Sequence, residues 1–243
     1  MKITKRKAND LYNDCYVAII DILGFKKLVE TKNSKYIHNL FNEFFASYNI
    51  EYKKNNQSIL WVSNDIVKMI VSSDTICLYI ASSEEDALGK LIAACAYFQV
   101  RMMRLQDPIL TRGAIVKDNL FADEDIFFGP GINKAYLLEE KTAITPRIIL
   151  TKSLINDCQA SSTDNCKEYI NTYTYEDTDK FYCIDSVFLF YGLNHGQIVW
   201  SKFVKHINNV IDSETDTSIR QKHIYVDYQI KRSIEKYKEK KQK

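Results

Sequence analysis

Residues 16–25 read YVAIIDILGF, and this stretch decides the fold of the chain. It opens with an apolar run rich in β-branched residues, which is typical of a central strand covered on both faces. Asp21 stands where that strand is expected to end. A carboxylate at the end of a buried strand is costly unless something pairs with it, so the stretch predicts a strand that carries Asp21 to a site or to the cap of the next helix.

Composition restricts the classes of protein to consider. The chain has 243 residues, 46% of them hydrophobic, which suffices for one large domain or a core with an appendage. Its formal net charge of +2 provides no global field for nucleic acid or an anionic membrane, so neither is expected as a partner. The six cysteines have no zinc-ligand spacing. With a polar N-terminus and no apolar stretch near the roughly 20 residues of a membrane span, a cytoplasmic location is expected.

The hydrophobic periodicity predicts alternating strands and helices. Strands are expected at 16–23, 59–71, 75–80, 109–116, 147–150, 181–184 and 187–191, and helices at 26–48 with a break near Asn33, at 83–104, from 132, at 198–211 and at 213–240. The first six elements follow the order βαββαβ. We therefore expect an α/β (α+β) fold with a ferredoxin-like core and a C-terminal strand and helix extension.

Three segments are expected along the chain. Residues 1–13 form a polar N-terminal segment, residues 14–192 the main domain, and residues 193–243 a helical extension. The lysine-rich end, KYKEKKQK, is expected to be a solvated helix end rather than a grip on nucleic acid.

Asp21 and Asp74 are the first candidate site. Asp74 lies in the polar turn SSD between two expected strands, and in a βαββαβ sheet this hairpin lies beside the first strand. Two carboxylates at contact distance share a proton or a cation, and Mg²⁺ or Mn²⁺ with substrate phosphates is the usual solution. Taken singly, Asp21 could cap the next helix and Asp74 is a common turn residue.

Two further stretches are candidates for substrate binding. Ile22, Leu23, Gly24 and Phe25 follow Asp21 at the start of an expected helix, where backbone N–H groups can seat a phosphate and Phe25 can anchor the turn in the core. Asn133, in GPGINKAYLLE, lies one turn into another expected helix. It could belong to the site or cap the first turn.

Together these stretches resemble the class III nucleotidyl cyclase domain. The family has an FxDIxGF-like segment, a second metal aspartate in a hairpin turn, an RxGIxxG-like strand and a GxxVNxAxR helix. Here they stand as IIDILGF, VSSDTICLYI, LTRGAIVKDNLF and FFGPGINKAYLLE, within residues 16–150. The short chain and the following TPRIIL make the sequence most similar to the bacterial pyrimidine cyclases of the Pycsar anti-phage systems.

The resemblance implies a reaction and a set of roles. Asp21, Asp74 and the Ile22 carbonyl match the ligands of two Mg²⁺ or Mn²⁺ ions, residues 22–25 match the triphosphate-binding backbone, and Asn133 matches the ribose-positioning asparagine. It also implies a homodimer with composite active sites and a separate effector that senses the cyclic nucleotide. The implied reaction converts UTP, or CTP, to the 3′,5′-cyclic monophosphate and pyrophosphate.

The chain departs from the family pattern at three places. The transition-state arginine is replaced by Leu137, and Arg112 or Arg147 could supply its charge or could be structural. A purine-reading lysine is replaced by Ile70, and the nearest equivalents of the paired aspartate are Asp125 and Ile126. The lysine and aspartate pair that binds a purine base in the family is therefore not found at these positions. Its absence is what an enzyme for a pyrimidine nucleotide would require.

Two other functions stay open from the sequence. Leu137 allows a catalytically silent cyclase-like domain that binds nucleotide or dimerises to regulate a partner. Another metal-dependent phosphoryl-transfer domain, polymerase-like or of the diguanylate cyclase type, is less favoured because VSSDT supplies a single carboxylate and no GG[DE]EF-type hairpin is present.

Overall fold

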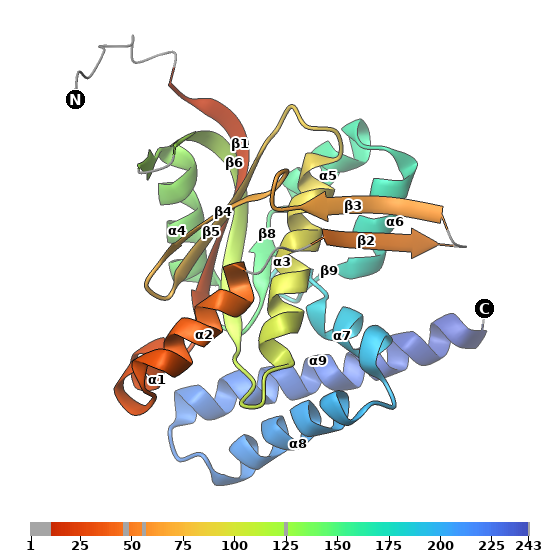
Figure 1. The fold of residues 1–243 in the computed structure, drawn as a ribbon. Helices are drawn as coiled ribbons and strands as arrows, with labels where there is room; N and C mark the ends of the chain where they lie inside the picture. The colour runs from red at the N-terminus through yellow and green to blue at the C-terminus, as the bar shows by residue number, and fades with distance from the viewer. Residues whose placement is uncertain (1–10, 46–48, 55–56, 124–125, 243) are drawn as a thin grey trace.

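A mostly antiparallel sheet lies at the centre of the chain in the computed structural model, which describes residues 11–45, 49–54, 57–123 and 126–242 (Figure 1). Its strands follow the order β4-β5-β1-β6-β8-β10-β9, and β6 and β8 run parallel. In that order they are Lys68–Ser72, Thr75–Ala81, Asn13–Ile22, Thr111–Ala122, Ile148–Leu150, Tyr182–Ile184 and Thr174–Glu176. The short β7, Phe127–Phe128, pairs with the end of β6.

The strand β1 is central, as its apolar run predicts. It pairs antiparallel with β5 on one side and with β6 on the other. Side chains of Ala18 and Ile20 enter the larger core, whereas Val17 and Ile19 enter a smaller one on the opposite face. The alternation of a strand places Asp21 on the face of Val17 and Ile19.

Helices cover the two faces unequally. The larger core lies beneath α1 (Phe25–Thr31), α2 (Ser34–Phe45) and α3 (Ala87–Met103), whose apolar side chains join those of β1. On the opposite face α4 (Pro130–Thr142) packs against β1 and β6 through Ala135. The face that carries Asp21 is therefore the face of α4.

The expected βαββαβ core is confirmed. Its elements are β1, α1 with α2, β4, β5, α3 and β6, and the sheet order β4-β5-β1-β6 is that of a ferredoxin-like fold. The break expected near Asn33 separates α1 from α2, where the Asn33 side chain accepts a hydrogen bond from the Tyr36 N–H.

Two expected strands are wrong. The run 59–71 is divided, because β3 (Gln57–Ser63) ends in a polar turn in which Ser63 O accepts from the Ile66 and Val67 N–H groups. With β2 (Asn49–Lys54), β3 forms a separate two-stranded sheet. The run 187–191 lies in the helix α7 (Ser186–Asn194), since an apolar run buried all round satisfies either structure. The expected boundary at residue 192 therefore falls within a helix.

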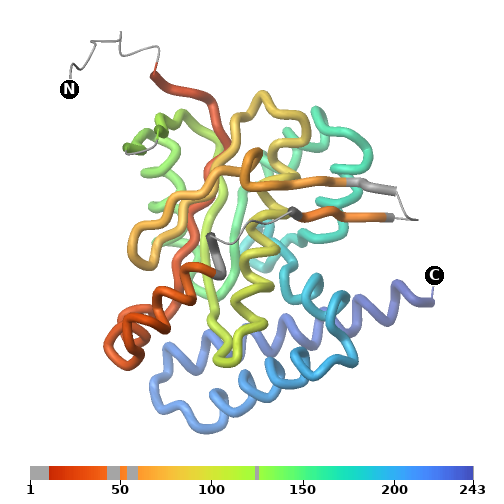
Figure 2. Tube along the Cα trace, viewed as in Figure 1, coloured from red at the N-terminus to blue at the C-terminus, as the bar shows by residue number. Residues whose placement is uncertain are grey.

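The C-terminal third is helical and packs onto the sheet domain (Figure 2). It contains α5 (Lys152–Ser161) and α6 (Asp164–Tyr173), which the sequence did not indicate, and α8 (Ile198–Ser213) and α9 (Thr217–Gln242), which it did. Buried Asp185 pairs with Arg232 and, at 2.8 Å, with Lys236. The long helix α9 is thus bound to the residue that precedes α7.

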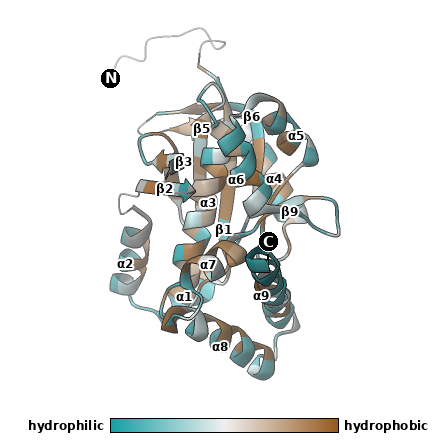
Figure 3. Cartoon of the chain, turned by 90° about the vertical axis from the view of Figure 1, so that its right-hand side faces the viewer, coloured by the Kyte–Doolittle hydropathy of each residue, from teal (hydrophilic) through white to brown (hydrophobic). Residues whose placement is uncertain are grey.

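The helices of the C-terminal part differ in hydropathy along the chain. Figure 3 shows α7 in hydrophobic colours and the C-terminal end of α9 in hydrophilic ones. Within the described ranges, no helix combines the length and the apolar character that crossing a membrane would require.

Candidate active site

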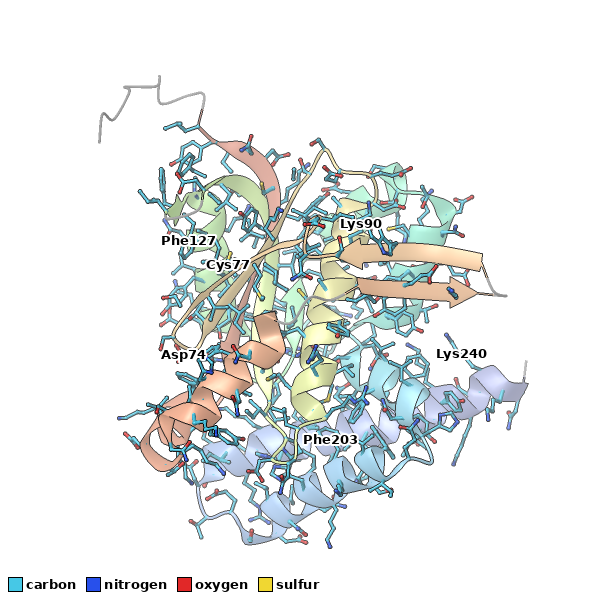
Figure 4. All side chains as sticks on the ribbon, viewed as in Figure 1. Asp74, Cys77, Lys90, Phe127, Phe203 and Lys240 are labelled. Atoms are coloured by element: carbon cyan, nitrogen blue, oxygen red, sulfur yellow. The ribbon has the colours of Figure 1, made fainter. Side chains whose placement is uncertain are left out.

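The sheet register brings Asp21 and the Asp74 turn together. Asp21 lies opposite Thr75 in the β1–β5 ladder, and the Ile22 N–H donates to Asp74 O at 3.0 Å. Figure 4 shows Asp74 at the tip of the β4–β5 hairpin. Two adjacent strands therefore hold the two candidate aspartates side by side at the end of β1, as the topology predicts.

Arg112 of β6, the strand on the other side of β1, adds a positive charge to this site. It lies opposite Asp21 in the β1–β6 ladder, and its Nε–H donates to Asp21 Oδ2 at 3.0 Å. The following residue, Gly113, permits the close approach of β6, since a Cβ there would lie 2.5 Å from Ile19 O. The arginine thus contacts the candidate metal ligand Asp21 directly.

A third carboxylate, Glu139 of α4, also reaches this cluster. Its Oε1 lies 2.7 Å from Arg112 Nε but accepts no hydrogen bond, and its side chain is 4% exposed. The pKa of Glu139 is raised to about 6, chiefly by burial; Arg112 opposes the rise, and nearby Asp21 and Asp74 contribute to it. Both aspartates are therefore close enough to Glu139 for their charges to act on it.

Glu139 is a site residue that the sequence reasoning missed, although a signal was present. Gly131, Ala135 and Glu139 are four residues apart and form the buried stripe of α4. A glutamate in a stripe otherwise made of small residues marks a charge directed at the sheet.

The donor set fits a divalent cation. Two carboxylates, Asp21 and Glu139, contact one guanidinium, the charge of Asp74 acts on Glu139, and the buried Glu139 Oε1 has no hydrogen-bond partner. Oxygen donors of this kind suit Mg²⁺ or Mn²⁺. Among the described residues, no group of three or more His, Cys, Asp or Glu side chains is arranged to hold a metal by itself. A cation here would need Asp21 and Asp74 together with backbone or substrate oxygens.

The turn after Asp21 offers fewer free N–H groups than expected. Ile22 donates to Asp74 O and Leu23 donates to Leu110 O at 3.0 Å, so both are engaged. Gly24 has a φ of 76°, a left-handed conformation that favours glycine, and a Cβ there would meet open space. The N–H groups of Gly24 and Phe25 remain without an acceptor in the described part of the chain.

Phe25 anchors this turn. Its side chain is buried and makes an edge-to-face contact with Phe41 of α2, with ring centroids 5.8 Å apart. The prediction of a core anchor beneath the turn is confirmed.

Asn133 lies at the other end of α4. Gly131 packs beside Val17, which precedes Asp21 by four strand residues, or about 13 Å along β1. The Asn133 side chain is exposed and does not cap the helix, whose N-cap position is Gly129. Phe127, which precedes α4, and Asp74 lie far apart in Figure 4. One chain therefore does not bring Asn133 to its own aspartates.

A hollow of about 800 Å³ adjoins Asn133. Tyr12, Phe128 and Leu137 line it with apolar surface, and their side chains are between 41% and 48% exposed. Leu137 thus presents an apolar side chain where the resembled family has an arginine.

The remaining expected substrate residues lie elsewhere. Ile70 of β4 is half-buried opposite Cys77, on the same sheet face as Asp21. Arg147 donates to Asp177 Oδ2 at 2.6 Å and pairs with Asp179, in an ion-pair cluster of its own. Asp125 lies outside the described residues.

Comparison with known proteins identifies no relative by sequence, since no protein-family model and no curated protein matches the chain. Three similar solved structures are nucleotidyl cyclase domains. The catalytic core of a rhodopsin-guanylyl cyclase with converted specificity, in complex with ATPαS, is 14% identical, with 71% of this chain and 96% of that chain covered and a TM-score of 0.44.

The other two are comparably distant. The adenylyl cyclase CyaB from P. aeruginosa is 13% identical, with 71% and 94% covered and a TM-score of 0.41. The monomeric guanylyl cyclase domain of the RhoGC fusion protein from the aquatic fungus Blastocladiella emersonii is 12% identical, with 71% and 95% covered and a TM-score of 0.41. At these scores the likeness is one of general form, and the chemistry must be inferred from the site.

Proposed function

We propose that the chain is a nucleotidyl cyclase that converts a pyrimidine nucleoside triphosphate, UTP ahead of CTP, to its 3′,5′-cyclic monophosphate and pyrophosphate. The observation that carries the proposal is the backbone hydrogen bond from Ile22 to Asp74, which holds both aspartates at the end of one strand pair. The N–H groups of Gly24 and Phe25, which have no acceptor among the described residues, lie immediately beyond.

The reaction is an intramolecular displacement at the α-phosphorus. The ribose 3′-oxygen forms a bond to this atom, the bond to the β-phosphate oxygen breaks, and the hydroxyl proton is lost as pyrophosphate leaves. Asp21, Asp74 and the Ile22 carbonyl would hold two Mg²⁺ or Mn²⁺ ions, which supply Lewis-acid stabilisation of the attacking and leaving oxygens.

Other residues would position the metal ligands and the nucleotide. Arg112 fixes one oxygen of Asp21 by its hydrogen bond and thereby leaves the other oxygen free to coordinate. Gly24 and Phe25 would donate to the terminal phosphates. Since Asn133 lies at the far end of α4, we place it in the second site of a homodimer, where it orients the ribose bound by the partner subunit.

The proposed preference for a pyrimidine base rests on Ile70, which lies on the same sheet face as Asp21. Ile70 offers no hydrogen-bonding group to a purine, and a smaller pyrimidine is the remaining choice within the resemblance. A role as a second-messenger generator for a separate effector in anti-phage defence rests on the resemblance alone.

A catalytically silent domain is the second candidate. The exposed Leu137 beside Phe128 favours it, because an apolar hollow suits dimerisation and supplies no positive charge to a transition state.

Incubation of the purified protein with each of ATP, GTP, CTP and UTP in Mn²⁺, followed by mass spectrometry, separates these functions. A cyclic pyrimidine monophosphate with equimolar pyrophosphate is expected. Absence of product from all four would support the silent domain, and a dinucleotide product would refute both candidates.

A further inference from the structure

A second cavity adjoins the turn that follows Asp21, since Leu23 and Gly24 contribute to its lining. It encloses about 280 Å³ between the start of α1, the loop 107–110 and the helices α8 and α9. Figure 2 shows the red-orange helix α1 beside the blue C-terminal hairpin at this place. Ligand cavities commonly range from roughly 300 to 1,000 Å³, so this volume suits a small molecule.

The wall of this cavity is mainly apolar. Leu28 of α1, Ile109 of the loop, Val210 of α8 and Ile219 of α9 contribute to it. Such a surface stabilises a compact apolar group by removing it from water, at about 25 cal/mol for each Å² buried.

Two lysines at the same cavity lack a charge partner. Lys27 and the half-buried Lys222 have no carboxylate within ion-pair distance in the described part of the chain. The two carboxylates of the wall are engaged elsewhere. Asp107 pairs with Lys32 at 3.0 Å, and Glu214 Oε1 accepts from the N–H groups of residues 215 and 216. The cavity therefore presents two lysine ammonium groups that have no carboxylate within ion-pair distance among the described residues.

Two histidines line the same cavity. The His206 and His223 rings lie with centroids 6.1 Å apart, and the Nδ1–H of His223 donates to Ile219 O at 2.8 Å. Nε2 of the neutral His223 ring is therefore an acceptor, and it becomes a donor to a bound carboxylate when the ring takes up a proton from water. Burial, with the neighbouring His223, lowers the pKa of His206, so an incoming anion would relieve an unfavourable environment for its charged form.

We propose that this cavity is a ligand site for a small molecule with an apolar body and a single carboxylate, bound through Lys222, His206 and His223. Occupancy would also fix the turn after Asp21, since Leu23 and Gly24 line the cavity and Leu23 donates to Leu110 O, another wall residue. Ligand binding is measured without nucleotide, so the binding proposal and the proposed cyclase activity can each fail without the other.

Calorimetric titration of the full chain with 2-naphthoate tests the proposal, with 2-naphthalenemethanol as the neutral analogue of the same shape. Saturable binding of one naphthoate per chain is expected, with the alcohol about tenfold weaker or more because it lacks the charge. Lys222→Gln should weaken naphthoate binding about tenfold and Lys222→Arg should largely preserve it. Lys238→Gln makes the same charge change on the same helix, outside the cavity, and should leave binding unaltered.

A cavity-filling variant, Ile219→Trp, should abolish binding of both compounds. Circular dichroism tests whether each variant is folded. If Ile219→Trp is unfolded, the comparison of the Lys222 and Lys238 variants tests the proposal. The proposal is overturned by the absence of saturable naphthoate binding, by equal binding of the alcohol, or by equal affinity of Lys222→Gln and the unchanged chain.

Discussion

Asp21 and Arg112 face each other across the central strands, with Arg112 Nε donating to Asp21 Oδ2 at 3.0 Å. The same nitrogen lies 2.7 Å from the buried Glu139 Oε1, to which it donates no hydrogen bond. One guanidinium thus stands between two carboxylates, and it orients only one of them. Aspartate orientation and the local charge balance consequently depend on a single side chain, and several variants can separate these contributions.

Asp21→Asn and Asp74→Asn should each lower cyclase activity by at least about a hundredfold, because an amide replaces the anionic oxygen that a divalent cation needs. Product is measured by mass spectrometry in Mn²⁺, and folding by the thermal midpoint. Asp164→Asn is the matched control, since that fully exposed side chain lies on α6. Near-normal turnover by either site variant would exclude the metal assignment.

Mixed subunits test the composite site. Asp21→Asn and Asn133→Ala should each be inactive alone, and an equimolar mixture should recover about a quarter of the activity if the subunits exchange at random, since half of the dimers then carry one intact site of two. The readout is the rate of cyclic nucleotide formation after co-incubation. A mixture as inactive as its components would contradict sharing of sites between chains.

Arg112 and Glu139 should be energetically coupled. Arg112→Gln leaves two carboxylates without their cation and should lower the free energy of unfolding, whereas the double variant with Glu139→Gln should regain part of the loss. A coupling of about 1–3 kcal/mol is expected for residues in contact, and urea denaturation in EDTA measures it. Additive effects would mean that the 2.7 Å approach has no energetic consequence.

Stability should depend on pH through Glu139. The folded-state pKa of about 6 lies above the ordinary value of 4.5, so the stability that this carboxyl contributes is fully present below pH 4.5 and is lost as pH rises through 6. In EDTA, Glu139→Gln should therefore gain about 2 kcal/mol relative to the unchanged chain between pH 4.5 and pH 7.5. Parallel pH profiles for the two proteins would show that Glu139 does not titrate in this way.

Arg147 should prove structural. Its side chain is 11% exposed and is paired with Asp177 and Asp179. Arg147→Met leaves Asp177 without its cation and should lower the free energy of unfolding by about 3–5 kcal/mol, as measured by urea denaturation. At a temperature where the variant is still folded, its KM for the nucleotide should be unchanged, whereas a raised KM would return Arg147 to the substrate site.

The central part of the fold was accessible from the sequence because local pattern and tertiary structure agree there. The run before Asp21 forms the buried central strand, and the hairpin turn at Asp74 lies beside its end. The run 187–191 was misassigned because an element buried on all sides loses the periodicity that distinguishes a helix from a strand.

The candidate site was only partly accessible for a similar reason. Asp21 stands out because it ends an apolar run, whereas Glu139 lies among other charged residues in LLEEK and becomes exceptional only when the buried stripe of α4 is recognised. Engagement of the Leu23 N–H by Leu110 depends on a loop from a distant part of the chain, which local sequence does not specify.

The bond between Asp185 and its two cations has a consequence for the whole C-terminal extension. Deleting residues 236–243 would remove Lys236, which also donates to Thr172 O at 2.8 Å, and a cut before Arg232 would remove both cations and leave the buried Asp185 carboxylate unpaired. Such truncations should therefore destabilise the sheet domain as well as the extension. We therefore expect the extension and the sheet domain to unfold in one cooperative transition, rather than the extension acting as a detachable regulatory arm.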